Sequence, residues 1–189
     1  MTKAFPAIAM LAAAAAAHAA VIRAPEQYNT GAPGTGKIVP IFVDGTETDV
    51  QGIFIGLKIE AGRIENWLHK GTGDGETAEP TLLQGSLNPI DPPFISPDGL
   101  HLYADYSLAF GQTPVSLPGL AGYLVLDTTG LAPGIYSISL ISEEFGDSSI
   151  TTVSMSPYSL VDGSFVVVPE PAAGLLLLAG LPMLRRRRA

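Results

Sequence analysis

The chain has 189 residues and no cysteine, which excludes disulfide bonds, thiol catalysis and cysteine-ligated metal sites. Between positions 20 and 168, five basic residues stand against seventeen acidic ones, a net charge of −12. A surface this acidic repels phosphate backbones, so nucleic acid is a poor partner, whereas cations and neutral polysaccharides remain compatible.

The first nineteen residues have the three parts of a secretory signal peptide. Lys3 supplies a short positive region, residues 4–17 form an apolar run dominated by alanine, and Ala17-His18-Ala19 has the small-x-small pattern that signal peptidase reads. We therefore expect cleavage after Ala19 and a domain that spans residues 20–167. A permanent transmembrane helix is the alternative, but the segment is short and alanine is only weakly apolar.

Most of the predicted domain alternates between apolar and polar residues with a period of two. This pattern is clearest at 53–60 and 100–108, and it is typical of half-buried strands. Clusters of Gly, Pro, Asn and Asp separate these segments and predict turns. Further strands are predicted at 38–43, 123–126, 135–141, 150–155 and 165–168.

Residues 62–70 are the one segment where we expect a short helix or a helical turn. Several short strands without a long helical pattern predict an all-β fold, an antiparallel β-sandwich. About 149 residues are enough for one domain with its own core. The predicted core contains Ile53, Ile55, Leu57, Leu102, Tyr106, Leu124, Leu126 and Ile141.

The segment from Leu131 to Tyr136, Leu-Ala-Pro-Gly-Ile-Tyr, places a turn just before a strand and a tyrosine near the start of that strand. This arrangement predicts a tyrosine corner, in which the hydroxyl donates to upstream backbone. With the preceding residues 124–130, the segment resembles the late hairpin of cohesin-like and related carbohydrate-binding sandwiches. Residues 36–60 are similar to their opening strands. The resemblance implies a cohesin-like or immunoglobulin-like sandwich and supports the fold more than a function.

Few residues are arranged for metal binding. His101 and Asp105 lie four positions apart on one strand, so they share a face and are able to bind one cation together; a solvent-exposed strand surface is the simpler interpretation. The acidic turns at 44–49 and 71–76 contain carboxylate and carbonyl oxygens of the kind that calcium prefers. Neither turn has EF-hand spacing, so we predict no cofactor and leave calcium open.

Catalytic patterns are equally sparse. The sequence has no Gly-x-Ser-x-Gly nucleophile elbow, and His69 has no neighbour at ligand spacing. Glu143 and Glu144 are adjacent between strands, so their side chains point to opposite faces instead of forming a glycosidase pair. Trp67, Tyr103 and Tyr106 offer sugar-stacking surface, although Tyr106 is on the inward register and Trp67 is more simply a core residue. We therefore predict that the protein is not an enzyme.

The last 22 residues have three ordered parts. Pro169, Glu170 and Pro171 form a stiff, extended unit because the two prolines remove backbone donors. Residues 172–184 carry no charge and would make roughly 20 Å of helix, short of the roughly 30 Å hydrocarbon core. Four basic residues follow and favour the cytoplasmic side of a membrane. These are Arg185, Arg186, Arg187 and Arg188.

This tail, residues 168–189, resembles the PEP-CTERM sorting signal, with Pro169, Glu170 and Pro171 as its signature triplet. The resemblance implies recognition by an exosortase, a short C-terminal membrane helix, transient anchoring in the inner membrane, removal of the tail, and delivery to the cell surface or extracellular matrix. A plain membrane anchor after a chance Pro-Glu-Pro is the alternative. Signal peptidase and exosortase are therefore the expected partners during export.

Three functions remain open for the domain. The leading hypothesis is a non-enzymatic surface or matrix protein, in which extracellular polysaccharide is one available partner. A secreted carbohydrate-binding module would need an exposed row of aromatic side chains, and only 7% of the chain is aromatic. A small secreted hydrolase would need a clustered acid–base pair, which the spacings do not supply.

Overall fold

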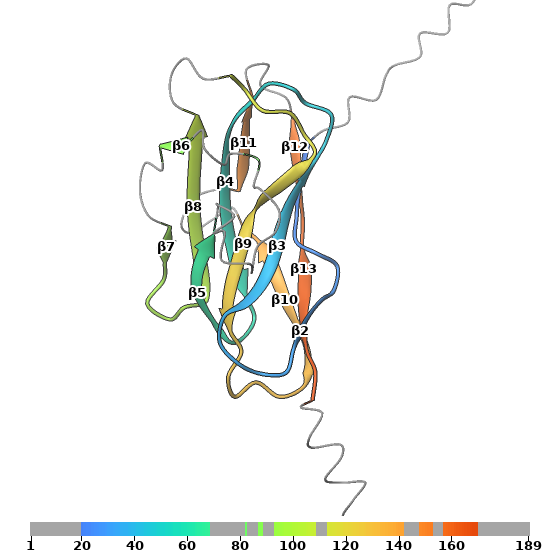
Figure 1. Ribbon diagram of the computed structural model, residues 1–189, viewed down its shortest axis with the longest axis vertical. Helices are drawn as coiled ribbons and strands as arrows, with labels where there is room; N and C mark the ends of the chain where they lie inside the picture. The colour runs from blue at the N-terminus through green and yellow to red at the C-terminus, as the bar shows by residue number, and fades with distance from the viewer. Residues whose placement is uncertain are drawn as a thin grey trace, which may run out of the picture.

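The computed structural model describes residues 20–68, 82, 87–88, 93–108, 113–141, 148–152 and 157–169, and these residues form thirteen strands and no helix (Figure 1). None of them belongs to a helix long and apolar enough to cross a membrane. The predicted signal peptide and nearly all of the predicted sorting tail lie outside the described residues. The all-β prediction is confirmed.

In chain order, the strands of the described residues are β1 (Ala20–Arg23), β2 (Tyr28–Gly31), β3 (Lys37–Asp44), β4 (Val50–Ile59), β5 (Arg63–Leu68), β6 (Leu87–Asn88), β7 (Phe94–Ile95), β8 (His101–Leu108), β9 (Gly119–Asp127), β10 (Gly134–Leu140), β11 (Ser149–Thr152), β12 (Tyr158–Val161) and β13 (Gly163–Val167).

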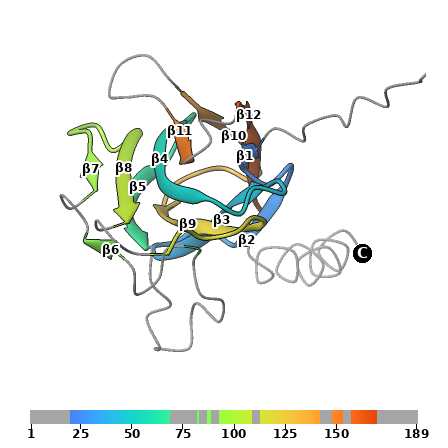
Figure 2. The same ribbon diagram turned by 90° about the horizontal axis from the view of Figure 1, so that it is seen from above.

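Two sheets face each other as a sandwich. The five-stranded sheet has the order β12-β1-β3-β9-β5, and the eight-stranded sheet has the order β2-β13-β10-β4-β8-β6, with β11 paired to β4 and β7 paired to β8. Figure 2 shows β3 and β9 in one layer and β4, β8 and β11 in the other. Pairing is antiparallel except at two edges, where β12 runs parallel to β1 and β2 runs parallel to β13. The antiparallel sandwich is thus confirmed, with two parallel pairs added.

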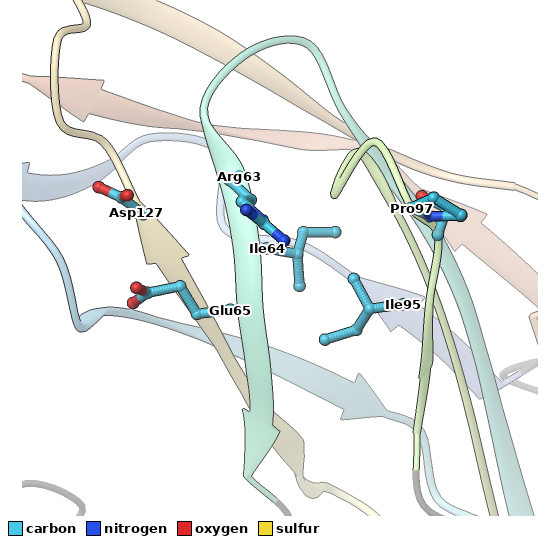
Figure 3. Close-up of a pocket in the computed structure, with 7 residues that line it drawn as sticks. Arg63, Ile64, Glu65, Ile95, Pro97 and Asp127 are labelled. Carbon is cyan, nitrogen blue, oxygen red and sulfur yellow. The ribbon is translucent and has the colours of Figure 1, made fainter.

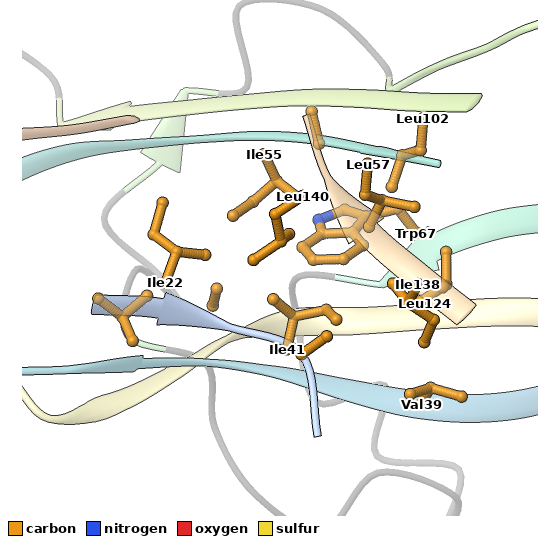
Figure 4. Close-up of a cluster of buried hydrophobic side chains, with 14 of the residues drawn as sticks. Ile22, Val39, Ile41, Ile55, Leu57, Trp67, Leu102, Leu124, Ile138 and Leu140 are labelled. Carbon is orange, nitrogen blue, oxygen red and sulfur yellow. The ribbon is translucent and has the colours of Figure 1, made fainter. Parts of the chain in front are cut away.

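The core fills the space between the sheets, because alternate residues of each strand point inward. Ile55 and Leu57 of β4 meet Ile41 of β3 and Leu124 of β9 across this space (Figure 4), and all four are fully buried. The predicted core residues that the structure finds buried are Ile53, Ile55, Leu57, Leu102, Leu124 and Leu126.

The other two predicted core residues, Ile141 and Tyr106, are not among the side chains found buried. Ile141 is only half-buried, because β10 ends one residue earlier and the buried position is Leu140. The backbone of Tyr106 belongs to β8, but its side chain is not among the described ones.

The helix predicted over residues 62–70 is wrong, since Arg63–Leu68 is strand β5 at the edge of the five-stranded sheet. The cause is a bulge between Ile64 and Asn66, which adds one residue against β9. The extra residue turns both Ile64 and Trp67 inward, three positions apart. That spacing imitates one face of a helix in the sequence.

All seven predicted strands are present, with ends that shift by a few residues. Besides β5, five strands have no counterpart in the prediction: β1, β2 and β12 have four residues each, and β6 and β7 have two each. Segments this short show too few alternations for a period to be recognised. Neighbouring strands hold them in place, as when β1 pairs with β3 and β12.

Two strands, β10 and β11, pair with the same edge of β4, and β8 pairs with the other edge. The chain leaves β10 at Ile141, whose amide donates to the Gly56 carbonyl at 2.9 Å, and it rejoins β4 at the buried Ser148. There the Gly56 amide donates to Ser148 Oγ at 2.9 Å, and Oγ donates back to the Gly56 carbonyl at 2.6 Å. One hydroxyl therefore replaces a rung of the backbone ladder where the pairing passes from β10 to β11.

The tyrosine corner is confirmed. The Tyr136 hydroxyl donates to the Ala132 carbonyl at 2.8 Å, and the Tyr136 ring stacks on Phe165 with 5.4 Å between ring centroids. The contact joins the β9–β10 connection to β10 and braces it against β13.

Candidate interaction surface

Nearly all predicted processing residues lie outside the described residues. These are Ala17, Ala19, Glu170, Pro171, Arg185, Arg186, Arg187 and Arg188. The structure describes Ala20, the residue after the predicted cleavage site, and Pro169, the first residue of the triplet. Ala20 is buried at the start of β1, and Pro169 is exposed two residues after β13 ends. The Val168 amide donates to the Gly31 carbonyl at 2.9 Å, so the sandwich holds the chain up to the first proline of the triplet.

The acidic turn at 44–49 makes internal contacts. Asp44 is paired with Arg23, whose guanidinium lies 4.6 Å from the centre of the Phe42 ring. Glu47 Oε2 accepts the Thr46 amide at 2.9 Å. Within the described residues, no group of three or more His, Asp or Glu side chains is placed to hold a metal ion. The second acidic turn, at 71–76, lies outside the described ranges, as do His69, Glu143 and Glu144.

His101 approaches a different carboxylate from the one predicted. It shares a strand face with Asp105, but its Nδ1 lies 3.7 Å from Asp98 Oδ1, and its side chain is half-buried, 15% exposed. The Ser96 hydroxyl, followed by the Leu100 amide and the charge of His101, holds the pKa of Asp98 below its ordinary value. Ser96 donates to Asp98 and not to a ring nitrogen, so these side chains cap the β7–β8 turn and form no catalytic triad.

A cleft of about 460 Å³ opens between β5 and the β7–β8 turn (Figure 3). Its lining residues are Arg63, Ile64, Glu65, Ile95, Ser96, Pro97 and Asp127. Figure 3 shows Ile64 and Ile95 turned toward each other, whereas Glu65 and Asp127 point away from them.

Both carboxylates of the cleft are held by nearby turns. Glu65 Oε2 accepts the Gly36 amide at 2.9 Å, and Asp127 Oδ1 accepts the Thr129 amide at 2.8 Å. The Thr129 hydroxyl and amide, followed by Arg63, lower the pKa of Asp127. Neither carboxylate is arranged as a proton donor, and the cleft resembles packing surface more than a catalytic site.

The outer face of the eight-stranded sheet carries a group of aromatic side chains. Phe54 of β4, Tyr103 of β8 and Phe94 of β7 come from adjacent strands, and their positions alternate with the buried ones. Phe94 lies directly opposite Tyr103. Phe54 is the diagonal neighbour of Tyr103 on β4, and diagonal neighbours in an antiparallel pair are about 7–8 Å apart. Phe94 is 48% exposed, and the other two are half-buried.

Polar residues border these rings on the same face. The exposed Lys58 pairs in register with His101, and Asp105 pairs with Phe54. We call the six residues the aromatic face: Phe54, Lys58, Phe94, His101, Tyr103 and Asp105.

The sequence gives little sign of the aromatic face. It indicates Tyr103 as a stacking residue, but Phe94 falls in a proline-rich stretch with no strand pattern, and Phe54 is only the alternate residue within a buried strand. The long-range pairing of β4 with β8 brings Phe54 and Tyr103 together, and β7, which directly precedes β8 in the chain, folds back on β8 and adds Phe94. Trp67, by contrast, is a core residue as the simpler interpretation predicted, 2% exposed.

The sequence matches no protein-family model and no curated protein. The structure is similar to cohesins. A chain of a type I cohesin–dockerin complex from Clostridium thermocellum aligns with a TM-score of 0.59 and 13% identity, over 79% of this chain and 99% of that one. A non-cellulosomal cohesin from Archaeoglobus fulgidus aligns at 0.56 and 16%, over 82% and 96%.

A third similar structure is the solution structure of the cohesin CaCohA2 from Clostridium acetobutylicum, with a TM-score of 0.57 and 15% identity over 80% of this chain and 92% of that one. Because the sequence identities are only 13–16%, the structural similarity establishes the fold alone. The chain is a cohesin-like β-sandwich, as the residues from Leu131 to Tyr136 led us to expect.

Proposed function

We propose that this protein is an exported, non-enzymatic binding module whose aromatic face recognises another protein. The observation that carries the proposal is the cluster of Phe54, Phe94 and Tyr103 on one sheet face, in a fold similar to cohesins along about four fifths of the chain. Solved neighbours of this fold are named as complexes with dockerins. A binding function also agrees with the internally bonded carboxylates of the cleft.

The chemistry of the face suits a protein partner. Central aromatic side chains supply most of the binding energy in protein interfaces, and a polar rim surrounds them. The cluster also supports the second candidate function, carbohydrate binding, because exposed Phe94 beside Tyr103 presents stacking surface. A glycan array with the secreted protein separates the two, since the proposal expects no glycan signal that depends on Phe94.

In this proposal, the predicted signals at the two ends of the chain determine where the protein is located. Cleavage after Ala19 would release the start of β1, and an exosortase would read Pro169, Glu170 and Pro171. Exposure of Pro169 immediately after the sandwich supports access to the triplet. The protein would then pass through transient inner-membrane anchoring to the cell surface or extracellular matrix.

The experiment compares Phe94→Ser with Val161→Ser, an apolar residue on the opposite sheet with the same exposed fraction, 48%. Immobilised secreted proteins are incubated with the extracellular fraction of the source bacterium, retained proteins are identified by mass spectrometry, and affinities are then measured with the purified partner. Loss of a central aromatic residue is expected to weaken binding roughly tenfold or more. Retention of the same partner by wild type and Phe94→Ser with equal affinity would reject the aromatic face as the binding surface.

A further inference from the structure

The chain leaves the sandwich toward its C-terminus beside the β9–β10 connection, residues 128–133, which crosses from the five-stranded sheet to the eight-stranded sheet. Val167, the last residue of β13, pairs with Gly134, the first residue of β10. Because β13 and β10 are antiparallel, the residues before Gly134 extend past the end of β13 in the direction in which Val168 and Pro169 continue. Figure 1 shows β13 ending at the same end of the molecule as the β9–β10 connection, with the β3–β4 connection at the other end.

The spacer between the domain and the apolar tail is very short. Val168 is still bonded to Gly31, and only Pro169, Glu170 and Pro171 separate it from the uncharged run 172–184. The four residue steps from Val168 to Ala172 span at most about 14 Å when fully extended. A tail inserted in a membrane would therefore hold this end of the sandwich at the headgroup region, which is about 5–8 Å deep on each side of the hydrocarbon core.

The connection at this end has an unusual surface for so acidic a protein. Residues 128–135 carry no charge, and the neighbouring Glu60 carboxylate accepts the Ser137 amide. Ala132 and Pro133 are exposed, and Ile135 is 58% exposed, more than any other large apolar side chain in the described part of the chain. Asp127, the acid just before this segment, pairs in register with Arg63 across β5 and β9, which offsets its charge.

We propose that this uncharged segment, residues 128–135, is a membrane-docking surface that rests on the lipid headgroups while the tail is inserted. The inference depends on the proposed function, because the tail must enter the membrane first. Exposed apolar side chains gain free energy in the interface, and the absence of charge on the segment avoids the cost of desolvating an ion there. Docking would set the orientation in which the membrane enzyme meets the Pro-Glu-Pro triplet.

The test uses the absence of cysteine in the chain to introduce one label at a time. Ala132→Cys places an environment-sensitive fluorophore on the β9–β10 connection, and Thr48→Cys places it on an exposed residue of the β3–β4 turn at the opposite end. The full chain is reconstituted in phosphatidylcholine vesicles with and without spin-labelled lipid. The emission of Trp67, the single tryptophan, reports that each variant has folded.

We expect the label at position 132 to shift to shorter wavelength and to be quenched by spin-labelled lipid, whereas the label at position 48 does neither. Adding Ile135→Ser, or a Gly-Ser spacer between Val168 and Pro169, should reduce the shift and the quenching. If the protein floats with the vesicles but the two labels show the same emission and the same quenching, the docking surface is rejected. Insertion of the tail in the membrane is then still supported. If the protein does not float with the vesicles, the membrane tail fails and the docking inference fails with it.

Discussion

Single side chains decide two of the local structures in this sandwich. Ser148 bridges the gap in the ladder on β4, and Tyr136 ties the β9–β10 connection to the strand that follows. His101 is a different case, because its Nδ1 lies near Asp98 of the preceding turn, a residue that strand spacing does not associate with it. Contacts of this kind depend on the direction of each side chain. The alternation along a strand shows only which of the two sheet faces a side chain lies on.

At this scale we predict that Tyr136→Phe lowers the free energy of unfolding by about 0.5–1 kcal/mol, the usual net contribution of one hydrogen bond. The change removes the 2.8 Å bond to the Ala132 carbonyl but keeps the ring on Phe165. Urea unfolding of the secreted protein measures the difference. Tyr158→Phe, at an exposed position of the edge strand β12, is the control and should be neutral. Equal stability of all three proteins would show that the corner contributes nothing.

Strand β5 is the element whose packing most depends on its partner. Its bulge turns Trp67 into the core opposite Leu124, and the indole occupies the space that the missing side chain of Gly122 leaves on β9. Among the described residues, Trp67 Nε1 is the buried side-chain nitrogen or oxygen that has no hydrogen-bond partner. Shape, and not polarity, therefore holds this indole in place.

At the element scale we predict that Gly122→Ala destabilises the sandwich by roughly 1–3 kcal/mol through overpacking. A methyl group at this position would lie 2.6 Å from Trp67 Cε2 and 2.9 Å from the Leu68 carbonyl oxygen. Because Trp67 is the single tryptophan, its emission should shift to longer wavelength as the indole is displaced.

The control for this change is Gly34→Ala, where an added methyl group would meet only the flexible end of Lys37, at 3.4 Å. It should leave both stability and emission nearly unchanged. The account of the β5–β9 packing is wrong if Gly122→Ala unfolds at the same urea concentration as the wild type with unaltered emission.

The whole molecule presents different surfaces in different directions. In the proposed arrangement the tail end faces the membrane, and the strands run away from it along the long axis (Figure 1). Both sheet faces would then stand upright, so the aromatic face is directed sideways and stays accessible during anchoring. The acidic turn at 44–49 lies at the far end, away from the headgroups.

At the scale of the whole molecule we predict that Glu170→Ala blocks maturation. An enzyme that reads the triplet needs the carboxylate, whereas a plain anchor loses one charge and partitions slightly better into the membrane. The unprocessed chain should accumulate in the membrane fraction, larger than the mature form by the mass of the tail. Immunoblots of membrane and extracellular fractions measure this in a host that carries an exosortase. Glu26→Ala, which removes one charge from the sandwich, should mature normally.

Normal size and normal release of the Glu170→Ala protein would leave the plain anchor as the better account. The folded domain should be unaffected in either case, because the last backbone bond to the sandwich is made by Val168.

The sequence by itself determined the fold class and most of the long strands. A period of two is a local property, so residues 53–60 and 100–108 reveal which side chains face the core without any partner strand. The turn before Tyr136 is equally local, and the tyrosine corner follows from it. The expected terminal signals also rest on local order of residue types, and they stay predictions.

Only the tertiary structure decided the features that depend on pairing between distant segments. The bulge in β5 exists only against β9, and without that partner the spacing of Ile64 and Trp67 is indistinguishable from a helical face. The short strands β1, β2 and β12 show too few alternations for a period to be recognised. The aromatic face requires β4, β7 and β8 to pair in one register. The pairing of β4 with β8 joins segments dozens of residues apart, and residue order within each segment does not encode it.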